Sequence, residues 1–186
     1  MRKTALSALW VAFLFACTTI PRALAVDAPR LDKKDGRYAL LVEGRPFLIL
    51  GGQIHNSSAW PSELPEVWQS LVALDANTVE APAYWEQIEP EEGHFDFSNL
   101  DQLVEGARAH HLHMVLLWFG TWKNGNMQYV PVWVKTNPKR FPRMIRPDGQ
   151  PTDVLSANSR ANLDADKTAF TALMRHLKQL QMARGL

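Results

Sequence analysis

The sequence predicts an α/β fold in which helices alternate with the strands of a parallel sheet. Largely apolar runs recur at residues 47–52, 77–83 and 113–119. Such runs are typical of strands that are buried on both faces. Segments with apolar residues at helical spacing follow each run. This alternation favours a parallel sheet with right-handed crossovers.

A strand and a turn are expected before the first apolar run. Residues 37–42 are predicted to form a strand, and the segment Glu43-Gly44-Arg45-Pro46 that follows is typical of a turn. The apolar run at residues 47–52 comes next. It contains no charged residue, which indicates burial on both faces.

Three helices are expected, each with apolar residues on one face. The first begins at Ser62 and the second at Ser98, because a Ser side chain can cap a helix N-terminus. Residues 120–162, before the last helix, are expected to form one long loop. The apolar faces consist of Leu64, Val67, Trp68, Leu71 and Leu74, then Leu100, Leu103, Val104 and Ala107, and finally Phe170, Leu173, Leu177 and Leu180.

Three strand–helix units of this kind resemble part of a (β/α)8 TIM-type barrel, which needs about 250 residues when complete. We therefore expect a truncated barrel with only about the first three βα units, in a domain over residues 47–186. Residues 26–46 form a lead-in of strand and turn. A short doubly wound sheet is the alternative. An open barrel leaves a sheet edge unpaired, so edge-to-edge self-association is the one protein contact expected.

The N-terminal residues 1–25 have the pattern of a secretory signal peptide. Basic residues at positions 2 and 3 precede an apolar run, and Ala23-Leu24-Ala25 fits a small-x-small cleavage site. We expect an exported protein, periplasmic or extracellular. The segment Leu14-Phe15-Ala16-Cys17 is a competing lipidation motif that would anchor Cys17 in a membrane. Its bulky Phe favours the first cleavage site.

Composition and motifs exclude several function classes. The formal net charge is only +1, which gives no electrostatic reason to expect a nucleic-acid partner. No Gly-rich phosphate loop or G-x-S-x-G elbow occurs, and no cofactor is expected. The tract His110-His111-x-His113 lies at the opposite end of the strands from the polar loops, so no metal site is expected.

Polar and aromatic residues follow each apolar run, where the strands of a parallel sheet meet at one edge. Indole rings stack on the apolar faces of sugars, and carboxylate, ammonium and amide groups bind sugar hydroxyls. A sugar site is therefore predicted, although each residue alone also fits a structural role. The nearby acids Glu89, Glu91 and Glu92 are expected to form a solvated turn. The expected site residues are His55, Tyr84, Trp85, Glu86, Trp122, Lys123 and Asn124.

Five motifs, in order along the chain, resemble those of family 35 glycoside hydrolases, the β-galactosidases. The family patterns are S-G-x-I-H-Y, N-T-[IV], W-N-x-H-E-P, G-x-[FY]-[DN]-F and L-P-x-W. Similarity to a bacterial branch of the family extends to W-F-G-x-W-K-N-G. The matching segments are Gly51-Gly52-Gln53-Ile54-His55-Asn56, Asn77-Thr78-Val79, Trp85-Glu86-Gln87-Ile88-Glu89-Pro90, Gly93-His94-Phe95-Asp96-Phe97 and Val130-Pro131-Val132-Trp133.

This resemblance implies a (β/α)8 barrel that cleaves β-galactosides with retention by means of two carboxylates about 5–5.5 Å apart. In the family these lie at strands four and seven, the first in an Asn-Glu pair. No Asn-Glu pair occurs here, so we expect a truncated product without the catalytic carboxylates and inactive alone. A noncatalytic carbohydrate-binding protein and another barrel glycosidase of the same clan are the alternatives.

The resemblance also assigns binding roles, with departures from the family pattern. Glu86 takes the place of a sugar-contacting Asn, and Asn124 takes the place of a sugar-contacting Glu, with Trp122 and Lys123 before it. Pro82 replaces a signature Tyr, whose hydroxyl Tyr84 is expected to supply instead. The expected ligand is a β-galactoside or a related oligosaccharide.

Overall fold

The structure is a computed structural model, and it describes residues 28–183. The predicted signal peptide and Cys17 therefore lie outside the described residues. The centre of the fold is a parallel sheet of order β4-β5-β6, made of β4 (Gly51–Gln53), β5 (Thr78–Tyr84) and β6 (His113–Phe119). The second and third apolar runs thus form the predicted strands.

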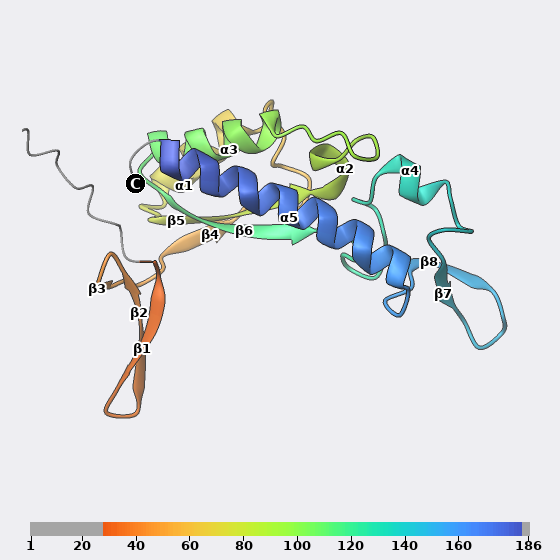
Figure 1. Cartoon of the computed structure of the whole chain (residues 1–186). Coiled ribbons are helices and arrows are strands. Elements are labelled where there is room, and N and C mark those ends of the chain that lie inside the picture. The colour runs from red at the N-terminus through yellow and green to blue at the C-terminus, as the bar shows by residue number, and fades with distance from the viewer. Residues whose placement is uncertain (1–27, 184–186) are drawn as a thin grey trace, which may run out of the picture.

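Three helices cover one face of this sheet, namely α1 (Leu64–Ala73), α3 (Ser98–Ala109) and α5 (Arg160–Ala183). Figure 1 shows them together on the same side. Each strand precedes one of these helices in the chain, which gives three consecutive βα units. A doubly wound sheet carries helices on both faces, so the described residues do not fit that alternative. Closure into a barrel stays a prediction.

The main core lies between the sheet and α1 and α3. Val79 and Ala81 of β5 are fully buried against Trp68 of α1 and Leu103 of α3. Gly106 of α3 lets the helices come close, because a Cβ there would lie 2.5 Å from the indole of Trp68. Burial of one such large side chain stabilises the fold by about 1.5–3 kcal/mol.

Smaller elements extend from both ends of the sheet (Figure 1). An antiparallel sheet of order β1-β2-β3 precedes β4, and a hairpin of β7 and β8 lies at the other end. Two short helices, α2 and α4, flank the carboxyl end of β5. Their bounds are β1 (Arg30–Lys34), β2 (Arg37–Val42), β3 (Arg45–Pro46), α2 (Trp85–Ile88), α4 (Val132–Lys135), β7 (Arg143–Ile145) and β8 (Pro151–Leu155).

The prediction that residues 47–52 form a buried strand is wrong over most of its length. Only β4 pairs with β5, and Leu48 and Leu50 are 74% and 56% exposed. The side chain of Asn77 holds this segment instead of a strand partner. Its Nδ2 donates to the carbonyl of Leu48 at 2.8 Å, and its Oδ1 accepts from the backbone N–H of Leu50 at 3.0 Å.

The predicted helix caps are also wrong, although the apolar faces are largely confirmed. The residues at the cap positions of α1 and α3 are Glu63 and Phe97, not Ser62 and Ser98, and neither forms a side-chain cap hydrogen bond. Asp96 takes that role near α3, because its Oδ1 accepts from the backbone N–H of Ser98 at 2.8 Å. This hydrogen bond lowers the pKa of the Asp96 carboxyl. Leu74 of the predicted α1 face is 73% exposed.

The predicted loop over residues 120–162 contains α4 and the β7–β8 hairpin. The turn of this hairpin is closed by a hydrogen bond from the N–H of Arg146 to the carbonyl of Gln150 at 2.8 Å. Its sequence, Pro147-Asp148-Gly149, is a turn signal between two short strands. The prediction of one continuous loop over residues 120–162 is therefore wrong.

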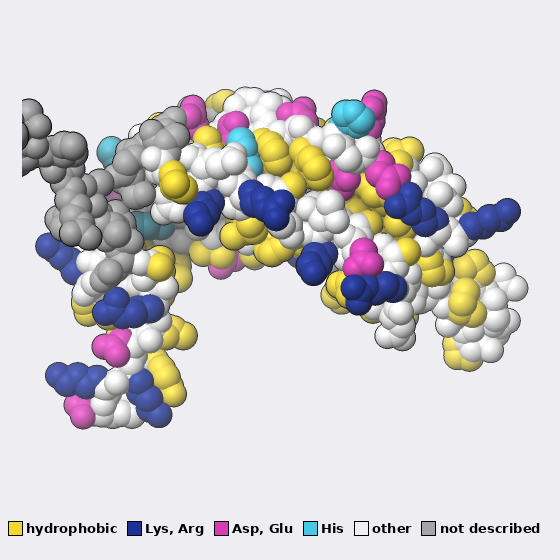
Figure 2. Space-filling model, in the orientation of Figure 1, with side chains coloured by type: hydrophobic (Ala, Val, Ile, Leu, Met, Phe, Trp, Pro, Cys, Tyr) yellow, Lys and Arg dark blue, Asp and Glu magenta, His cyan; other side chains and the backbone are white. Residues whose placement is uncertain are grey.

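The face of the sheet opposite the helices carries exposed apolar residues. Figure 2 shows apolar side chains along this lower side of the sheet layer. Val115 of β6 is 37% exposed. Across residues 28–183, no helix is both long and apolar enough to cross a bilayer.

Candidate functional site

The carboxyl ends of the strands lie at one edge of the parallel sheet. Tyr84, the last residue of β5, is in register with Phe119, the last residue of β6. The chain after β4 stays beside β5, because the N–H of Ile54 donates to the carbonyl of Glu80 at 3.0 Å. The segments that leave the strands at this edge are therefore neighbours.

Four aromatic rings pack together at this edge, and we call them the aromatic wall: Trp60, Tyr84, Phe119 and Tyr129. The ring of Tyr84 stacks on that of Tyr129, with centroids 5.0 Å apart, and contacts the edge of Phe119 at 5.8 Å. Tyr129 lies 5.0 Å from Phe119, and Trp60 stacks on Tyr84 at 6.0 Å. These separations lie in the range of favourable aromatic pairs.

Tyr84 is the buried centre of the aromatic wall. Its side chain is 1% exposed, and its hydroxyl accepts a hydrogen bond from the backbone N–H of Ala59 at 3.2 Å. Desolvation by burial raises the pKa of the Tyr84 phenol to about 12. The structure therefore gives Tyr84 a packing role, in which it fixes the loop after β4. Its contact with a sugar stays a prediction.

Tyr129 is a member of the wall that the sequence interpretation missed. Its hydroxyl lies 3.4 Å from Oγ of Ser57, and its carbonyl accepts from the N–H of Glu86 at 2.9 Å. The residue thus connects the loops that follow all three strands. The available signal was its position directly before the Val130-Pro131-Val132-Trp133 motif.

Lys123 and Asn124 belong to a tight hairpin turn after β6. The N–H of Lys123 donates to the carbonyl of Asn126 at 3.0 Å, and the reverse bond measures 3.1 Å. Asn124 and Gly125 both have positive φ, at 52° and 78°. An Asn-Gly pair is typical of this geometry. The turn alone therefore explains Asn124, and the sequence interpretation missed this signal.

The turn places a cation against the aromatic wall. Nζ of Lys123 lies 4.2 Å from the centroid of the Phe119 ring, within the range of a cation–π contact. Trp122 beside it is 61% exposed. An indole and an ammonium group are thus accessible from one short segment.

Glu86 and Trp85 have different environments, although they are neighbours in sequence. The Glu86 carboxylate forms an ion pair with Nζ of Lys135 at 3.2 Å, with both side chains partly exposed. Trp85 is fully buried and packs at a right angle to Trp133, with centroids 6.0 Å apart. A role of Trp85 in sugar contact stays a prediction, and its observed role is packing.

The prediction of a solvated acidic turn is wrong for Glu89. This residue is 3% exposed, and its carboxylate accepts from Nε1 of Trp85 at 3.0 Å and from the N–H of Gly93 at 2.9 Å. Glu91 and Glu92 are exposed, as expected. The side-chain hydrogen bonds from Arg140 hold the pKa of Glu92 below its usual value.

His55 lies at the exposed end of the same edge. Its Nδ1 accepts from the N–H of Ser57 at 3.3 Å, and Ser57 in turn faces Tyr129. The structure therefore connects His55, Tyr84 and Lys123 through the wall. Within residues 28–183, no group of three or more His, Cys, Asp or Glu side chains is placed to hold a metal ion.

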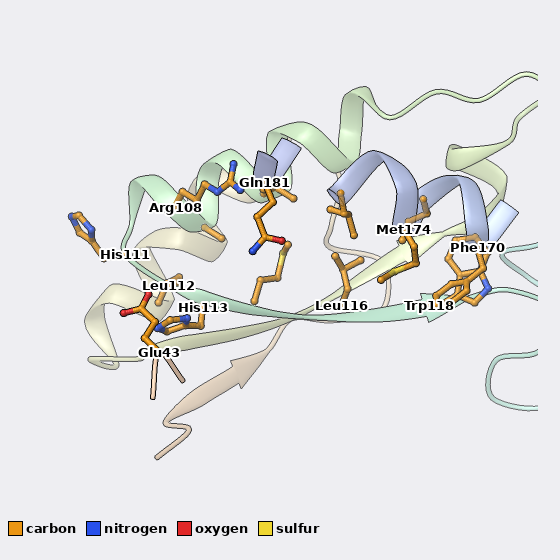
Figure 3. A pocket seen from close by; sticks show the side chains of 15 residues that line it. Glu43, Arg108, His111, Leu112, His113, Leu116, Trp118, Phe170, Met174 and Gln181 are labelled. Atoms are coloured by element: carbon orange, nitrogen blue, oxygen red, sulfur yellow. The ribbon is translucent and has the colours of Figure 1, made fainter. Parts of the chain in front are cut away.

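A large groove is separate from this edge. It has a volume of about 830 Å³ and lies between α3, β6 and α5 (Figure 3). Leu116 and Trp118 line it from β6, and Phe170 and Met174 line it from α5. Side chains alternate across a strand, so Phe119 faces the side of the sheet away from these residues.

The family of the chain follows from comparison with known sequences. The sequence model of the glycosyl hydrolases family 35 matches residues 39–148, more than half of the chain. The chain belongs to glycosyl hydrolases family 35. The matched residues include the ends of β4, β5 and β6 and the whole aromatic wall. The family resemblance of the five motifs is thereby confirmed.

Curated relatives of the chain are longer family members. The chain is 34% identical over 77 residues to the beta-galactosidase of Xanthomonas manihotis, which covers 40% of the chain and 13% of that protein. It is 28% identical over 138 residues to beta-galactosidase 13 of Arabidopsis thaliana, covering 68% of the chain and 15% of that protein. The chain therefore spans about a seventh of the length of these relatives.

Solved structures of two glycosidases show partial similarity. The exo-beta-1,4-mannosidase Op5Man5 from Opitutaceae bacterium strain TAV5 has 26% identity and a TM-score of 0.40, covering 47% of the chain and 17% of that protein. The intracellular xylanase TsXylA from Thermoanaerobacterium saccharolyticum has 25% identity and a TM-score of 0.40, covering 69% and 34%. Both scores are below 0.5, so neither likeness defines the fold.

Proposed function

We propose that the chain is the N-terminal part of an exported, retaining glycoside hydrolase that acts on β-galactosides. Membership of family 35 supports the reaction class, and the names of the curated relatives support the galactoside. In this proposal the three βα units belong to a (β/α)8 barrel, and residues 1–25 direct export. The observation that carries the proposal is the aromatic wall at the carboxyl edge of the sheet, where such barrels bind substrate.

The wall and its surroundings suit one side of a sugar subsite. Trp60, the one exposed ring of the wall, and the exposed Trp122 offer faces to the C–H surface of a pyranose, and the neighbouring ammonium and carboxylate groups bind its hydroxyls. Trp122 and Lys123 approach the ligand from the turn after β6, and the ion pair of Glu86 with Lys135 approaches it from the end of β5. His55 borders the subsite on the β4 side.

Glu86 and Glu89 are poor candidates for the catalytic pair. A retaining enzyme needs one carboxylate free to attack and one free to exchange a proton. Glu86 is paired with Lys135, and Glu89 is buried with both oxygens bound to protein donors. We therefore propose that these residues bind sugar or support the fold, and that the chain alone does not hydrolyse galactosides.

Calorimetric titration of the full chain with methyl β-D-galactopyranoside tests the recognition part. Saturable binding is expected, and Trp122→Ala is expected to weaken it, because the variant loses an exposed indole. Tyr38→Ala is the matched control, since Tyr38 is an equally exposed aromatic residue on β2, outside the site. Absence of saturable binding by the unmodified chain would contradict the proposal.

Hydrolysis of an aryl β-galactoside tests the catalytic part. The purified chain is expected to show no turnover above the solvent rate. Measurable turnover that is abolished by Glu86→Gln or Glu89→Gln would overturn the assignment of these carboxylates to binding and folding. A contaminating enzyme is recognised because its turnover would survive both substitutions.

A noncatalytic carbohydrate-binding protein is the second candidate. It is favoured by the observation that α1, α3 and α5 bury one face of the sheet in connected core clusters. Such a protein should unfold in one cooperative thermal transition, raised by the galactoside. A broad or absent transition would favour a part of a larger barrel.

Self-association at the sheet edges completes the proposal. Among the described residues, β4 and β6 each pair only with β5, and their outer edges are open. Open apolar edges favour strand addition. Sedimentation velocity is expected to show concentration-dependent dimers, reduced by Val115→Lys on β6. A monomer at all concentrations would contradict this part.

A further inference from the structure

We infer that Asp166 of α5 is a positioning residue for the turn at residues 122–126, and this inference rests on the proposed function of that turn in sugar binding. Asp166 lies forty residues beyond the end of the turn in sequence, and its carboxylate bonds to Trp118 and Thr121, neither of which belongs to the aromatic wall. Its carboxylate instead binds the segment that leads from β6 into the turn.

Both oxygens of Asp166 are used for this purpose. Oδ1 accepts from the indole Nε1 of Trp118 at 2.7 Å. Oδ2 accepts from the backbone N–H of Thr121 at 2.6 Å, and also from the Thr121 hydroxyl. Hydrogen bonds to an ionised acceptor are shorter and stronger than neutral ones. The carboxylate therefore fixes the chain on both sides of Gly120.

Gly120 shows how closely the helix side chain approaches the strand end. A Cβ at this position would lie 2.4 Å from Nε1 of Trp118 and 2.5 Å from Oδ2 of Asp166. Such contacts are shorter than real carbon contacts, so a side chain at residue 120 would displace the carboxylate. The absence of a side chain at Gly120 is thus part of the same arrangement.

Trp118 is held from α5 at a second point. Its ring contacts Phe170, with centroids 5.8 Å apart, and Figure 3 shows the two side chains next to each other beneath α5. Asp166 and Phe170 are one helical turn apart, so they project from the same face of α5. Helix α5 therefore holds the Trp118 indole in two ways, by the hydrogen bond from its N–H to Asp166 and by the ring contact with Phe170.

The hydrogen bonds between Thr121 and Asp166 set the orientation of the turn. It is closed internally by the two backbone bonds between Lys123 and Asn126, which make it a rigid unit. Thr121 is the residue that joins this unit to β6, one position before Trp122. Fixing Thr121 therefore directs the Lys123 ammonium toward the Phe119 ring and presents the Trp122 indole.

The carboxylate acts through the turn rather than on a ligand. Its two oxygens already accept three hydrogen bonds from protein donors. It is consequently assigned no contact with substrate. Loss of Asp166 should alter the position of Trp122 and Lys123 and leave the wall itself in place.

Hydrogen exchange of the full chain tests the inference through Asp166→Asn, which keeps the shape of the side chain but removes its charge. Exchange of the amides in peptides spanning residues 119–126 is expected to rise by about tenfold, from the loss of a charge-assisted bond. Peptides of α1 and α3 should keep their exchange rates. Asp164→Asn is the matched control, because Asp164 is on the same helix and its carboxylate pairs with the exposed Arg160.

Titration with methyl β-D-galactopyranoside gives the second readout. Asp166→Asn is expected to weaken binding several-fold, and Asp164→Asn to leave it unchanged. Unchanged exchange at residues 119–126 in Asp166→Asn overturns the positioning role whatever the sugar affinity. A different result is faster exchange in Asp166→Asn together with no sugar binding by the unmodified chain. It would overturn the proposed function but would support the positioning of the turn by Asp166.

A milder variant covers the case in which Asp166→Asn does not fold. Trp118→Phe keeps an aromatic ring beside Phe170 but replaces the indole by a smaller ring without the N–H that donates to Oδ1. It is expected to raise exchange over residues 119–126 by a smaller factor of the same sign. The inference is contradicted if exchange over residues 119–126 is unchanged in the variants that fold.

Discussion

The indole nitrogen of Trp85 donates a hydrogen bond to Oε2 of Glu89, 3.0 Å away, inside the core. The other carboxylate oxygen accepts from the N–H of Gly93, and the Glu89 carbonyl accepts from Nε1 of Trp133 at 3.1 Å. One buried acid therefore satisfies two indole N–H groups and closes the turn after α2. Trp85, which the sequence predicts to contact a sugar, and Glu89, which it predicts to be solvated, thus bond to each other in the core.

Replacement of Glu89 by Gln is expected to destabilise the fold by about 1–3 kcal/mol, because the amide NH₂ group cannot accept the bond that a carboxylate oxygen accepts. Urea unfolding followed by fluorescence measures the change. Glu91→Gln is the matched control, since Glu91 is exposed in the same turn. Its change should stay within about 0.5 kcal/mol. Equal losses in the two variants would show that the buried hydrogen bonds of Glu89 contribute little.

Tyr84 predicts a loss of stability at alkaline pH. Its pKa is raised by burial to about 12 in the folded chain, against about 10 in an unfolded chain. The folded state thus holds the phenol proton more tightly. This contribution is fully present below about pH 10 and is lost as the pH rises toward about 12. Its full size is roughly 1–3 kcal/mol.

The alkaline loss is measured as the difference between the unmodified chain and Tyr84→Phe, which has no phenol proton. Urea unfolding from pH 8 to pH 11 should show a steeper fall for the unmodified chain, because other titrating groups are common to both. Parallel curves would mean that the Tyr84 proton is not held by the fold. The variant also loses the acceptor for Ala59, so its stability near neutral pH is expected to be lower.

The sequence predicts the regular elements well, because burial patterns repeat along them. The strand expected over residues 113–119 agrees with β6 in both bounds, and the buried face of α3 was predicted residue by residue. The segment at residues 47–50 fails for a different reason. Its apolar composition predicts burial, but no neighbouring strand lies on its outer side among the described residues. Composition alone does not reveal a missing partner.

The candidate site was only partly predictable, because packing partners distant in sequence decide what each side chain does. The sheet edge was predicted from the order of strands and loops, and Lys123 does lie at that edge. Trp85 and Glu89 satisfy each other in the core. The hydrogen bond from Thr121 to Asp166 joins residues 45 positions apart, and no local sequence pattern indicates it.

Asn77 is expected to stabilise the irregular segment before β4. Asn77→Ala removes an acceptor for the N–H of Leu50 and a donor to the carbonyl of Leu48, and it should cost about 1–3 kcal/mol. Asn77→Asp keeps the acceptor and loses the donor, so it should cost less. Urea unfolding ranks the stabilities of the unmodified chain, Asn77→Asp and Asn77→Ala. An Asp variant as unstable as the Ala variant would assign the whole effect to the Leu48 bond.

Asn124 offers a direct separation of turn formation from sugar contact. The residue has a φ of 52°, which glycine adopts without strain and alanine does not. Asn124→Gly is therefore expected to preserve the turn, and Asn124→Ala to destabilise it by about 1 kcal/mol. Both variants lack the side-chain amide that the family resemblance assigns to sugar binding.

The two Asn124 variants are compared by thermal unfolding and by titration with methyl β-D-galactopyranoside. If Asn124 serves only the turn, the Gly variant binds like the unmodified chain, and the Ala variant loses both stability and affinity. If its amide also contacts the sugar, the Gly variant keeps its stability and still binds more weakly. Because Asn124 and Gly125 both have the positive φ of a tight hairpin turn, the turn role is the outcome that we expect. A stable Gly variant with weakened binding would contradict it.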